Sequence, residues 1–265
     1  MKPTEAYELW LEKLEKDDPM RSELLAIRDN ETEITDRFYQ TISFGTAGLR
    51  GICGAGSNRM NELTVGRATA GIGDYILSSG EDIQRGVVFA YVCRYNSKVF
   101  SELAAQILAA KRIKVYLFPS LRPTPELSYA IRKLGAVSGV NMTASHNPKE
   151  YNGYKAYWED GAQVLMPHDT GIIDEVGKVH VQDVKFKGNP ALIEIIGEDV
   201  DRIYLEKIHT LSIDPEVIKH QKDLKIVYTP LHGTGMKLIP QSLKLWGFEN
   251  VHCVKEQMIK SGDFP

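Results

Sequence analysis

The stretch VVFAYVCRYNSKVFSELAAQILAAKRIKVYLF, residues 87–118, decides the fold. It opens with an apolar, β-rich run at 87–92, continues with a helical pattern over 98–111 and closes with a second apolar run at 115–118. Strands that alternate with helices are typical of a layered sheet. The stretch therefore predicts an α/β protein.

The same alternation extends to both sides of this stretch. A helical pattern covers 64–77, and residues 123–126 (PTPE) open another helix over 127–134. Gly135 is placed to end that helix as a C-cap, and an apolar strand follows at 136–142. We expect this last strand to run directly into a functional loop.

The N-terminal part reads differently. Residues 5–39 show helical spacing interrupted at 17–19, which predicts a helical cap made of two stretches. Residues 44–61 are rich in glycine and contain Arg50 and Arg59. We expect this second region to be too irregular for a helix or a strand.

Residues 209–265 contain one β-α-β unit, with strands near 224–228 and 251–254 around a helix over 236–246. A parallel sheet with one crossover has unpaired edges and little core. We therefore expect a first domain at 1–208 and the shortened start of a second domain at 209–265.

Composition limits the classes of function. The chain has 265 residues, 43% hydrophobic and 25% charged, and 32 basic against 35 acidic residues leave a net charge of -3. This balance excludes disorder, collagen and coiled coil, and it gives no basic field for nucleic acid or an anionic membrane. No apolar run suits a membrane span or a signal peptide, and three cysteines without a CxxC pair give no disulfide framework. We expect a cytoplasmic protein.

The first chemical motif is TASHNP at 143–148, directly after the strand at 136–142. A serine at the carboxyl end of a strand lies where α/β sheets bind ligands, so the hydroxyl of Ser145 should be exposed beside His146. Asn152-Gly153 favours a reversing turn that would bring Lys155 back toward the serine. The alternative is a capped turn without chemistry.

The second motif is FGTAGLRG at 44–51. Its glycines, Gly48 among them, allow backbone N–H groups to approach a phosphate, and Arg50 can bind one through two hydrogen bonds. Two anion-suited loops in one chain suggest a single phosphorylated substrate.

Together these motifs resemble a known family. FGTAGLRG (44–51), RPTPELSYAIRKLGA (122–136), TASHNPKEYNGYK (143–155) and TPLHGTG (229–235) are similar to the α-D-phosphohexomutases, in particular the phosphoglucomutase and phosphopentomutase branch. The resemblance covers essentially the whole chain. It implies a three-layer α/β/α first domain followed by an incomplete second domain of similar type.

The resemblance also implies a reaction. Ser145 would carry a phosphoryl group and exchange it with a sugar phosphate through a bisphosphate, converting glucose 1-phosphate to glucose 6-phosphate. His146 and Lys155 would act as general acid and base, and Arg50 would steady the phosphoryl group. The implied substrate and phosphate-binding residues are Thr46, Gly48, Arg50, Asn147 and Arg94.

The implied cofactors are Mg²⁺, held at Ser145 through its phosphate, and glucose 1,6-bisphosphate as activator. The family's Asp-x-Asp-x-Asp-Arg metal loop and its later sugar and phosphate loops are not found in this sequence. The acidic run at 198–202 (EDVDR) is interpreted as the start of a solvated helix, with a metal role as the alternative. We therefore expect the chain to need the remaining domains of the same enzyme as partners and to be inactive alone.

Two further positions bear on the loop that carries Ser145. Val92 stands where the family usually has an aspartate, whose loss would weaken the support of that loop. Arg94 is either a partner behind the phosphate or carboxylate groups or one half of a surface ion pair.

His232 lies in a segment interpreted as a structural turn.

Two alternative functions stay open. The chain is either a mutase for pentose, mannose or glucosamine phosphates, or a non-catalytic fragment that binds a phosphosugar or a partner domain.

Overall fold

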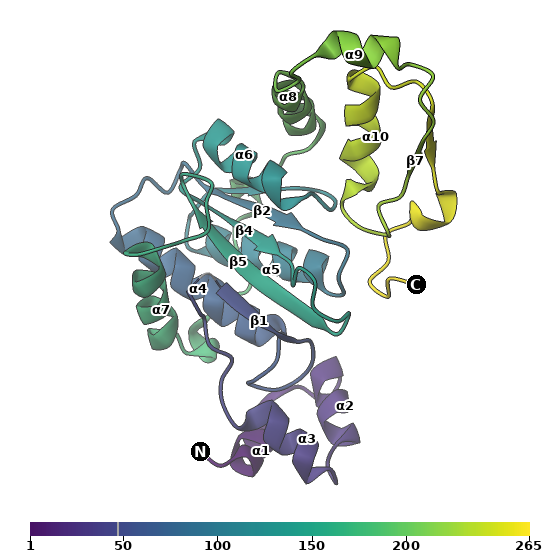
Figure 1. Cartoon of the computed structure of the whole chain (residues 1–265). Helices are drawn as coiled ribbons and strands as arrows, with labels where there is room; N and C mark the ends of the chain where they lie inside the picture. Colours follow the sequence, from purple (N-terminus) through teal and green to yellow (C-terminus); the bar gives the residue numbers. More distant parts are fainter. Residues whose placement is uncertain (47) are drawn as a thin grey trace.

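The structure, a computed structural model, describes residues 1–46 and 48–265, and Ala47 of the glycine-rich region lies outside the described residues. Figure 1 shows a central sheet covered by helices, a helical group at the N-terminal end and a smaller unit near the C-terminus. The described helices are α1 (Pro3–Lys13), α2 (Pro19–Ala26), α3 (Glu31–Phe38), α4 (Glu62–Ser78), α5 (Ser97–Ala110), α6 (Thr124–Leu134), α7 (His168–Lys178), α8 (Glu198–His209), α9 (Pro215–His220) and α10 (Gly235–Leu245). The described strands are β1 (Gly48–Ile52), β2 (Val87–Tyr91), β3 (Val115–Leu117), β4 (Ser138–Met142), β5 (Tyr151–Trp158), β6 (Ile193–Ile195), β7 (Ile226–Tyr228) and β8 (Val251–Cys253).

The central sheet has six strands in the order β1-β5-β4-β2-β3-β6. β2 is parallel to β3 and β4, and β3 is parallel to β6, whereas β5 is antiparallel to β4 and to β1. All of these strands except β5 therefore run in one direction, and their carboxyl ends lie at one edge of the sheet. The predicted α/β class is confirmed, and β4 brings the serine motif to that edge.

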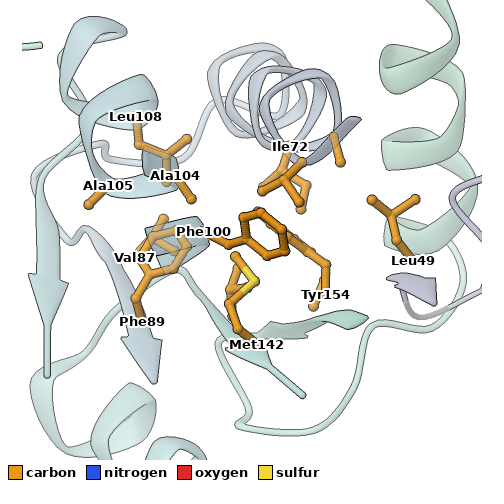
Figure 2. Packing of buried hydrophobic residues seen from close by; sticks show 14 of the residues in the cluster. Leu49, Ile72, Val87, Phe89, Phe100, Ala104, Ala105, Leu108, Met142 and Tyr154 are labelled. Atoms are coloured by element: carbon orange, nitrogen blue, oxygen red, sulfur yellow. The ribbon is translucent and has the colours of Figure 1, made fainter. Parts of the chain in front are cut away.

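Both faces of the sheet are covered, which makes three layers. Val87 and Phe89 of β2 pack with Ile72 of α4 in one apolar cluster, to which α5 and α7 also contribute (Figure 2). The alternate residues of β2, Val88 and Ala90, pack on the opposite face against α6 and α8. A run that is apolar at every position is what a strand covered on both sides requires.

The longest described helix, α4, has 17 residues and lies close to α7. A Cβ atom on Gly71 of α4 would come within 2.5 Å of the Val176 side chain, so glycine permits this close contact. Within residues 1–46 and 48–265, no helix combines the length and the apolar character needed to cross a membrane.

The expectation that residues 44–61 contain no strand is wrong, because β1 lies within them. β1 pairs with β5, with Gly48 opposite Lys155. A Cβ atom on Gly48 would lie 1.7 Å from the carbonyl oxygen of Tyr154, and Gly48 has a φ of 139°. Glycine here permits the backbones to approach rather than preventing strand pairing.

The N-terminal cap consists of three helices rather than the two predicted stretches. The additional break occurs at Asn30, whose side chain accepts a hydrogen bond from the Glu33 amide and so caps α3. The cap also holds the glycine-rich region: the Ala55 amide donates to Glu23 at 3.1 Å, and its carbonyl accepts from Arg37 at 3.1 Å. Two helices of the cap thus fix the segment that follows β1.

The C-terminal part contains the predicted β-α-β unit. β7 and β8 are parallel, with Ile226 opposite Val251, and α10 lies between them in the chain. α10 also lies beside α8, where Lys237 forms an ion pair of 2.7 Å with Asp201. This contact ties the second unit to the central sheet region.

The acidic run at 198–202 does begin a helix, α8, but the expectation that its carboxylates are solvated is wrong for Asp201. Asp201 is 3% exposed and accepts hydrogen bonds from Arg122 at 2.7 and 3.0 Å. Burial alone would raise the pKa of Asp201, but the hydrogen bonds from Arg122 and Lys237 lower this pKa below its ordinary value. Helix periodicity turns this residue inward, where two cations compensate its charge.

Candidate active site

The serine loop, residues 143–150, connects β4 to β5 at the carboxyl edge of the sheet. Its start is fixed by the Thr143 amide, which donates to the Gly153 carbonyl at 2.9 Å. Ser145 has a left-handed backbone, with a φ of 55°, and its amide donates to the Thr143 hydroxyl at 3.2 Å. This sharp turn leaves Ser145 exposed. The geometry suits a nucleophile because the hydroxyl faces solvent while the backbone is held.

Arg94 is the residue that holds this loop together. It is 6% exposed, and its guanidinium donates four hydrogen bonds to backbone carbonyls of and next to the loop. The acceptors are Pro148 at 2.8 Å, Tyr151 at 2.9 Å, Ser145 at 3.0 Å and Asn147 at 2.6 Å. Burial lowers the pKa of the Arg94 guanidinium.

The predicted role of Arg94 behind a phosphate or carboxylate group stays a prediction. Its interpretation as half of a surface ion pair is wrong, because the residue is buried and pairs with no carboxylate among the described residues. Instead it gives irregular backbone the hydrogen bonds that a helix or sheet would supply. The expected weakening of the loop by Val92 stays a prediction.

His146 lies next to the serine hydroxyl. Oγ of Ser145 and Nδ1 of His146 are 3.3 Å apart, and the imidazole tautomer determines which of them donates. Both residues are exposed. The imidazole is thus within reach of the hydroxyl proton.

Arg50 and Lys155 occupy one face of the sheet beside the loop. Lys155 of β5 lies opposite Gly48 of β1, and Arg50 of β1 lies opposite Gly153 of β5. Each long cation therefore faces a glycine, and their side chains share a face because opposed residues in antiparallel strands point the same way. Burial and the charge of Arg50 lower the pKa of Lys155.

A cavity of about 260 Å³ is formed here. Its lining residues are Gly45, Thr46, Gly48, Leu49, Arg50, Tyr154, Lys155 and Gln163. Four predicted site residues, Thr46, Gly48, Arg50 and Lys155, are thus gathered in one cavity. Ser145, His146 and Asn147 lie on the adjoining serine loop and are not among its lining residues.

The predicted reversing turn at Asn152-Gly153 is wrong, because both residues lie within β5. The chain reverses earlier, inside the serine loop, and Lys155 reaches its place as part of a strand. The Asn152 side chain is buried and donates to the Tyr95 carbonyl at 2.8 Å and to the Ser97 hydroxyl at 2.9 Å. An asparagine-glycine pair is thus used here for a buried hydrogen bond and a close backbone approach.

Asn147 contributes to the loop through its backbone in the described contacts. Its amide donates to the Ala144 carbonyl at 3.1 Å, and its own carbonyl accepts from Arg94. Its side-chain oxygen is buried without a hydrogen-bond partner among the described atoms. The phosphate-binding role predicted for this amide stays a prediction.

The residues that sequence reasoning missed lie around the loop. Tyr95 and Lys149 both bind Asp263, which is far away in the sequence. Gly153 matters through its backbone, since a Cβ atom there would lie 2.5 Å from the Thr143 carbonyl oxygen. No sequence pattern signals the Asp263 contacts, whereas an isolated glycine in a strand is a recognised sign of close backbone approach.

The described residues do not provide a metal site. No group of three or more histidine, cysteine, aspartate or glutamate side chains gathers among residues 1–46 and 48–265. The one buried carboxylate of the run at 198–202, Asp201, binds cations of the protein itself. A phosphorylated Ser145 would offer phosphate oxygens, but no group of three such ligand side chains accompanies it among the described residues, so we derive no step through Mg²⁺.

His232 fits its predicted structural role. It is 6% exposed, has a φ of 66°, and its Nδ1 lies 2.8 Å from the Ile259 carbonyl. The segment between β7 and α10 is thus held by an internal hydrogen bond, as a turn requires.

Comparison with known proteins identifies the family. The family model described as "Phosphoglucomutase/phosphomannomutase, alpha/beta/alpha domain I" matches residues 41–182, and the model for domain II of the same family matches residues 202–265. The chain belongs to the phosphoglucomutase/phosphomannomutase family. The predicted superfamily and its α/β/α fold are thereby confirmed.

Relatives in this family are longer than the chain. A phosphoglucomutase of Staphylococcus haemolyticus is 40% identical over 233 residues, which is 83% of this chain and 40% of that protein. A glucose 1,6-bisphosphate synthase of Homo sapiens is 38% identical over 245 residues, 88% of this chain and 39% of that protein. The chain thus spans about two fifths of the length of these relatives.

A solved structure shares the fold. The crystal structure of a phosphoglucomutase/phosphomannomutase family protein from Burkholderia thailandensis superposes with a TM-score of 0.62 at 22% identity, covering 84% of this chain and 45% of that one. The structural likeness supports the three-layer arrangement of the phosphohexomutase fold in this chain.

Proposed function

We propose that this phosphohexomutase-family chain exchanges a phosphoryl group between Ser145 and a sugar phosphate. In the whole protein, the exchange would convert glucose 1-phosphate to glucose 6-phosphate through glucose 1,6-bisphosphate. The observation that carries the proposal is the presentation of Ser145: an exposed hydroxyl on a left-handed backbone, in a loop fixed by Arg94. A mobile or buried serine would not serve, since phosphoryl transfer depends on positioning.

In the proposed step, Oγ of Ser145 attacks phosphorus in the sugar bisphosphate. An oxygen–phosphorus bond forms at the serine while the bond from phosphorus to the sugar oxygen breaks. The hydroxyl proton passes to His146, whose Nδ1 is 3.3 Å from Oγ, and the sugar oxygen takes a proton from Lys155. In the reverse direction, the free hydroxyl of a sugar monophosphate attacks the phosphorus of phosphoserine, Lys155 takes the hydroxyl proton, and His146 returns a proton to Oγ of Ser145 as the serine oxygen–phosphorus bond breaks. Attack of Ser145 on the other phosphorus of the resulting bisphosphate then releases the isomeric monophosphate.

The charges of the cavity support this assignment. Arg50 and Lys155 place two cations on one sheet face beside the loop, where a dianionic phosphoryl group must be neutralised. The lowered pKa of Lys155 favours proton donation over the behaviour of a fully solvated lysine. Thr46 and the Gly48 backbone line the same cavity and are available to a phosphate.

Intact-mass spectrometry tests the proposal on the 265-residue chain. Wild type and Ser145→Gly are incubated with glucose 1,6-bisphosphate, with and without Mg²⁺. Glycine is the matched variant because it removes the hydroxyl and tolerates the φ of 55°. One phosphoryl group on wild type and none on the variant is the expected result for this half-reaction, whereas net conversion of glucose 1-phosphate still requires the remaining domains. Equal phosphorylation of both chains contradicts the role of Ser145, and none on either favours the non-catalytic alternative.

The sugar is tested by the same measurement on the whole protein, because the family's sugar loop is not found in this sequence. We propose glucose bisphosphate as the donor, and pentose, mannose or glucosamine bisphosphates are the alternatives. Faster phosphorylation of Ser145 by glucose 1,6-bisphosphate than by ribose 1,5-bisphosphate supports the hexose. The opposite order supports a pentose phosphate and leaves the serine mechanism in place.

A further inference from the structure

The segment 261–264, which follows the β-α-β unit formed by β7, α10 and β8, lies against the serine loop. The Asp263 carboxylate accepts a hydrogen bond from the Tyr95 hydroxyl at 2.5 Å and from Lys149 Nζ at 3.2 Å. Lys149 belongs to the serine loop itself. One carboxylate from the second unit therefore connects the loop to the segment after β2.

Two neighbours of Asp263 strengthen this contact. The ring centroid of Phe264 lies 5.7 Å from Cζ of Arg94, so an aromatic face covers the guanidinium that holds the loop carbonyls. Gly262 lies against the Tyr95 ring, where an added Cβ atom would approach ring atoms to 3.2 Å. Residues 262–264 thus lie against three side chains of and beside the serine loop, those of Tyr95, Lys149 and Arg94.

Asp263 binds exposed side-chain ends, whereas the internal support of the loop is made by buried side chains. Arg94 binds the carbonyls of the loop from within, and Asn152 binds the Tyr95 carbonyl from within. Asp263 binds the outer ends, the Tyr95 hydroxyl and the Lys149 ammonium, each about half exposed. The hydrogen bond to Asp263 is the main cause that raises the pKa of Tyr95 and of Lys149, and the two bonds lower the pKa of Asp263.

We propose that residues 262–264 form a latch from the second unit that fixes the orientation of the serine loop, with Asp263 as its positioning residue. Asp263 touches neither the serine nor a substrate. The latch would act by reducing the range of positions that the loop samples, which raises the fraction of chains with Ser145 ready to react. Its kinetic consequence rests on the proposed function, whereas its structural consequence does not.

Amide hydrogen exchange of residues 144–152 tests the structural part without any substrate. Asp263→Asn and Tyr95→Phe should each speed exchange in this segment by about twofold to fivefold, the effect expected for a half-exposed pair. The double variant should show less than the summed effect of the single variants, because both act on the Tyr95–Asp263 hydrogen bond, while Asp263→Asn also removes the charge that pairs with Lys149. Glu216→Gln is the matched control, since Glu216 pairs with Lys219 on α9 and not with the loop.

The kinetic part is measured as the rate of Ser145 phosphorylation by glucose 1,6-bisphosphate. Asp263→Asn should lower the maximal rate about twofold to fivefold with an unchanged half-saturating concentration, and Asp263→Glu should recover part of the loss. Unchanged exchange in Asp263→Asn and Tyr95→Phe overturns the latch. A wild type that takes no phosphoryl group, with faster exchange in both variants, overturns the proposed function and leaves the latch standing.

Discussion

Nη2 of Arg94 donates a hydrogen bond of 3.0 Å to the carbonyl oxygen of Ser145. The serine is thus fixed through its backbone, and its hydroxyl is left unrestrained by this contact. The same guanidinium serves three further carbonyls, so one side chain supplies four hydrogen bonds to the backbone of this region.

Replacing Arg94 should therefore destabilise the fold. Arg94→Lys keeps the charge but cannot reproduce the planar fork, so several partly buried carbonyls lose their donors. We expect a loss of about 2–4 kcal/mol in the free energy of unfolding, measured by urea denaturation. Arg202→Lys, on the exposed surface of α8, is the control and should change stability by less than about 0.5 kcal/mol. Equal effects of the two variants would contradict the role of Arg94.

Gly48 should be intolerant of any side chain. Gly48→Ala would place Cβ 1.7 Å from the Tyr154 carbonyl oxygen, which forces β1 away from β5. We expect a destabilisation of at least about 3 kcal/mol by thermal or urea unfolding. Gly177→Ala in α7 is the control because a Cβ atom there meets nothing within 4 Å, and it should stabilise by up to about 1 kcal/mol. A mild effect at Gly48 would show that the β1–β5 pairing is not formed as described.

The pKa of Lys155 should respond to its neighbour. Burial and the positive charge of Arg50 lower this pKa, so Arg50→Gln should raise it by removing the second cause. NMR titration of isotope-labelled lysine side chains measures the shift directly. Arg59→Gln serves as the control, because Arg59 pairs with Asp36 and does not line the cavity. A pKa of Lys155 that is the same in wild type and Arg50→Gln would exclude this coupling.

Glu126 should make stability depend on pH. It is buried, and its Oε2 lies 3.6 Å from Nε of Arg122 without a hydrogen bond. Burial together with Asp201 raises the pKa of Glu126 to about 8, although the charge of Arg122 acts to lower it. The folded chain then holds a proton that the unfolded chain releases above its ordinary pKa of 4.5, so the free energy of unfolding falls as pH rises between these values. The slope is at most about 1.4 kcal/mol per pH unit.

Urea denaturation at several pH values in this window checks the sign. Glu126→Gln should have a flatter profile than wild type, because the amide neither binds nor releases the proton. Glu206→Gln, on the exposed side of α8, should retain the wild-type slope. A profile that is equally steep in Glu126→Gln would assign the pH dependence to other groups.

Sequence patterns predicted the central sheet well because each strand there is covered on both sides. Val87–Tyr91 is apolar at every position, and Gly135 ends α6 with a φ of 65° as its place in the pattern indicates. The serine motif was located correctly at a strand end by the same reasoning. These features depend on neighbours in sequence, which local patterns record.

The errors concern residues whose role depends on distant partners. Gly48 and Gly153 read as loop residues, yet each is required by a backbone on the neighbouring strand. Asp201 reads as a solvated helix residue until Arg122 is brought beside it. Tyr95 and Asp263 are 168 positions apart, a separation at which a single sequence carries no pairing signal.

β1 is an edge strand of the central sheet, and Arg50 lies on it. A strand at the margin of a sheet presents backbone groups that can recruit a strand from another molecule, and natural proteins discourage this with charged side chains. We therefore expect the charge of Arg50 to oppose the pairing of β1 with a strand of another molecule. Removing it exposes this margin to self-association, so the activity of an Arg50 variant has meaning only in a preparation shown to be monodisperse.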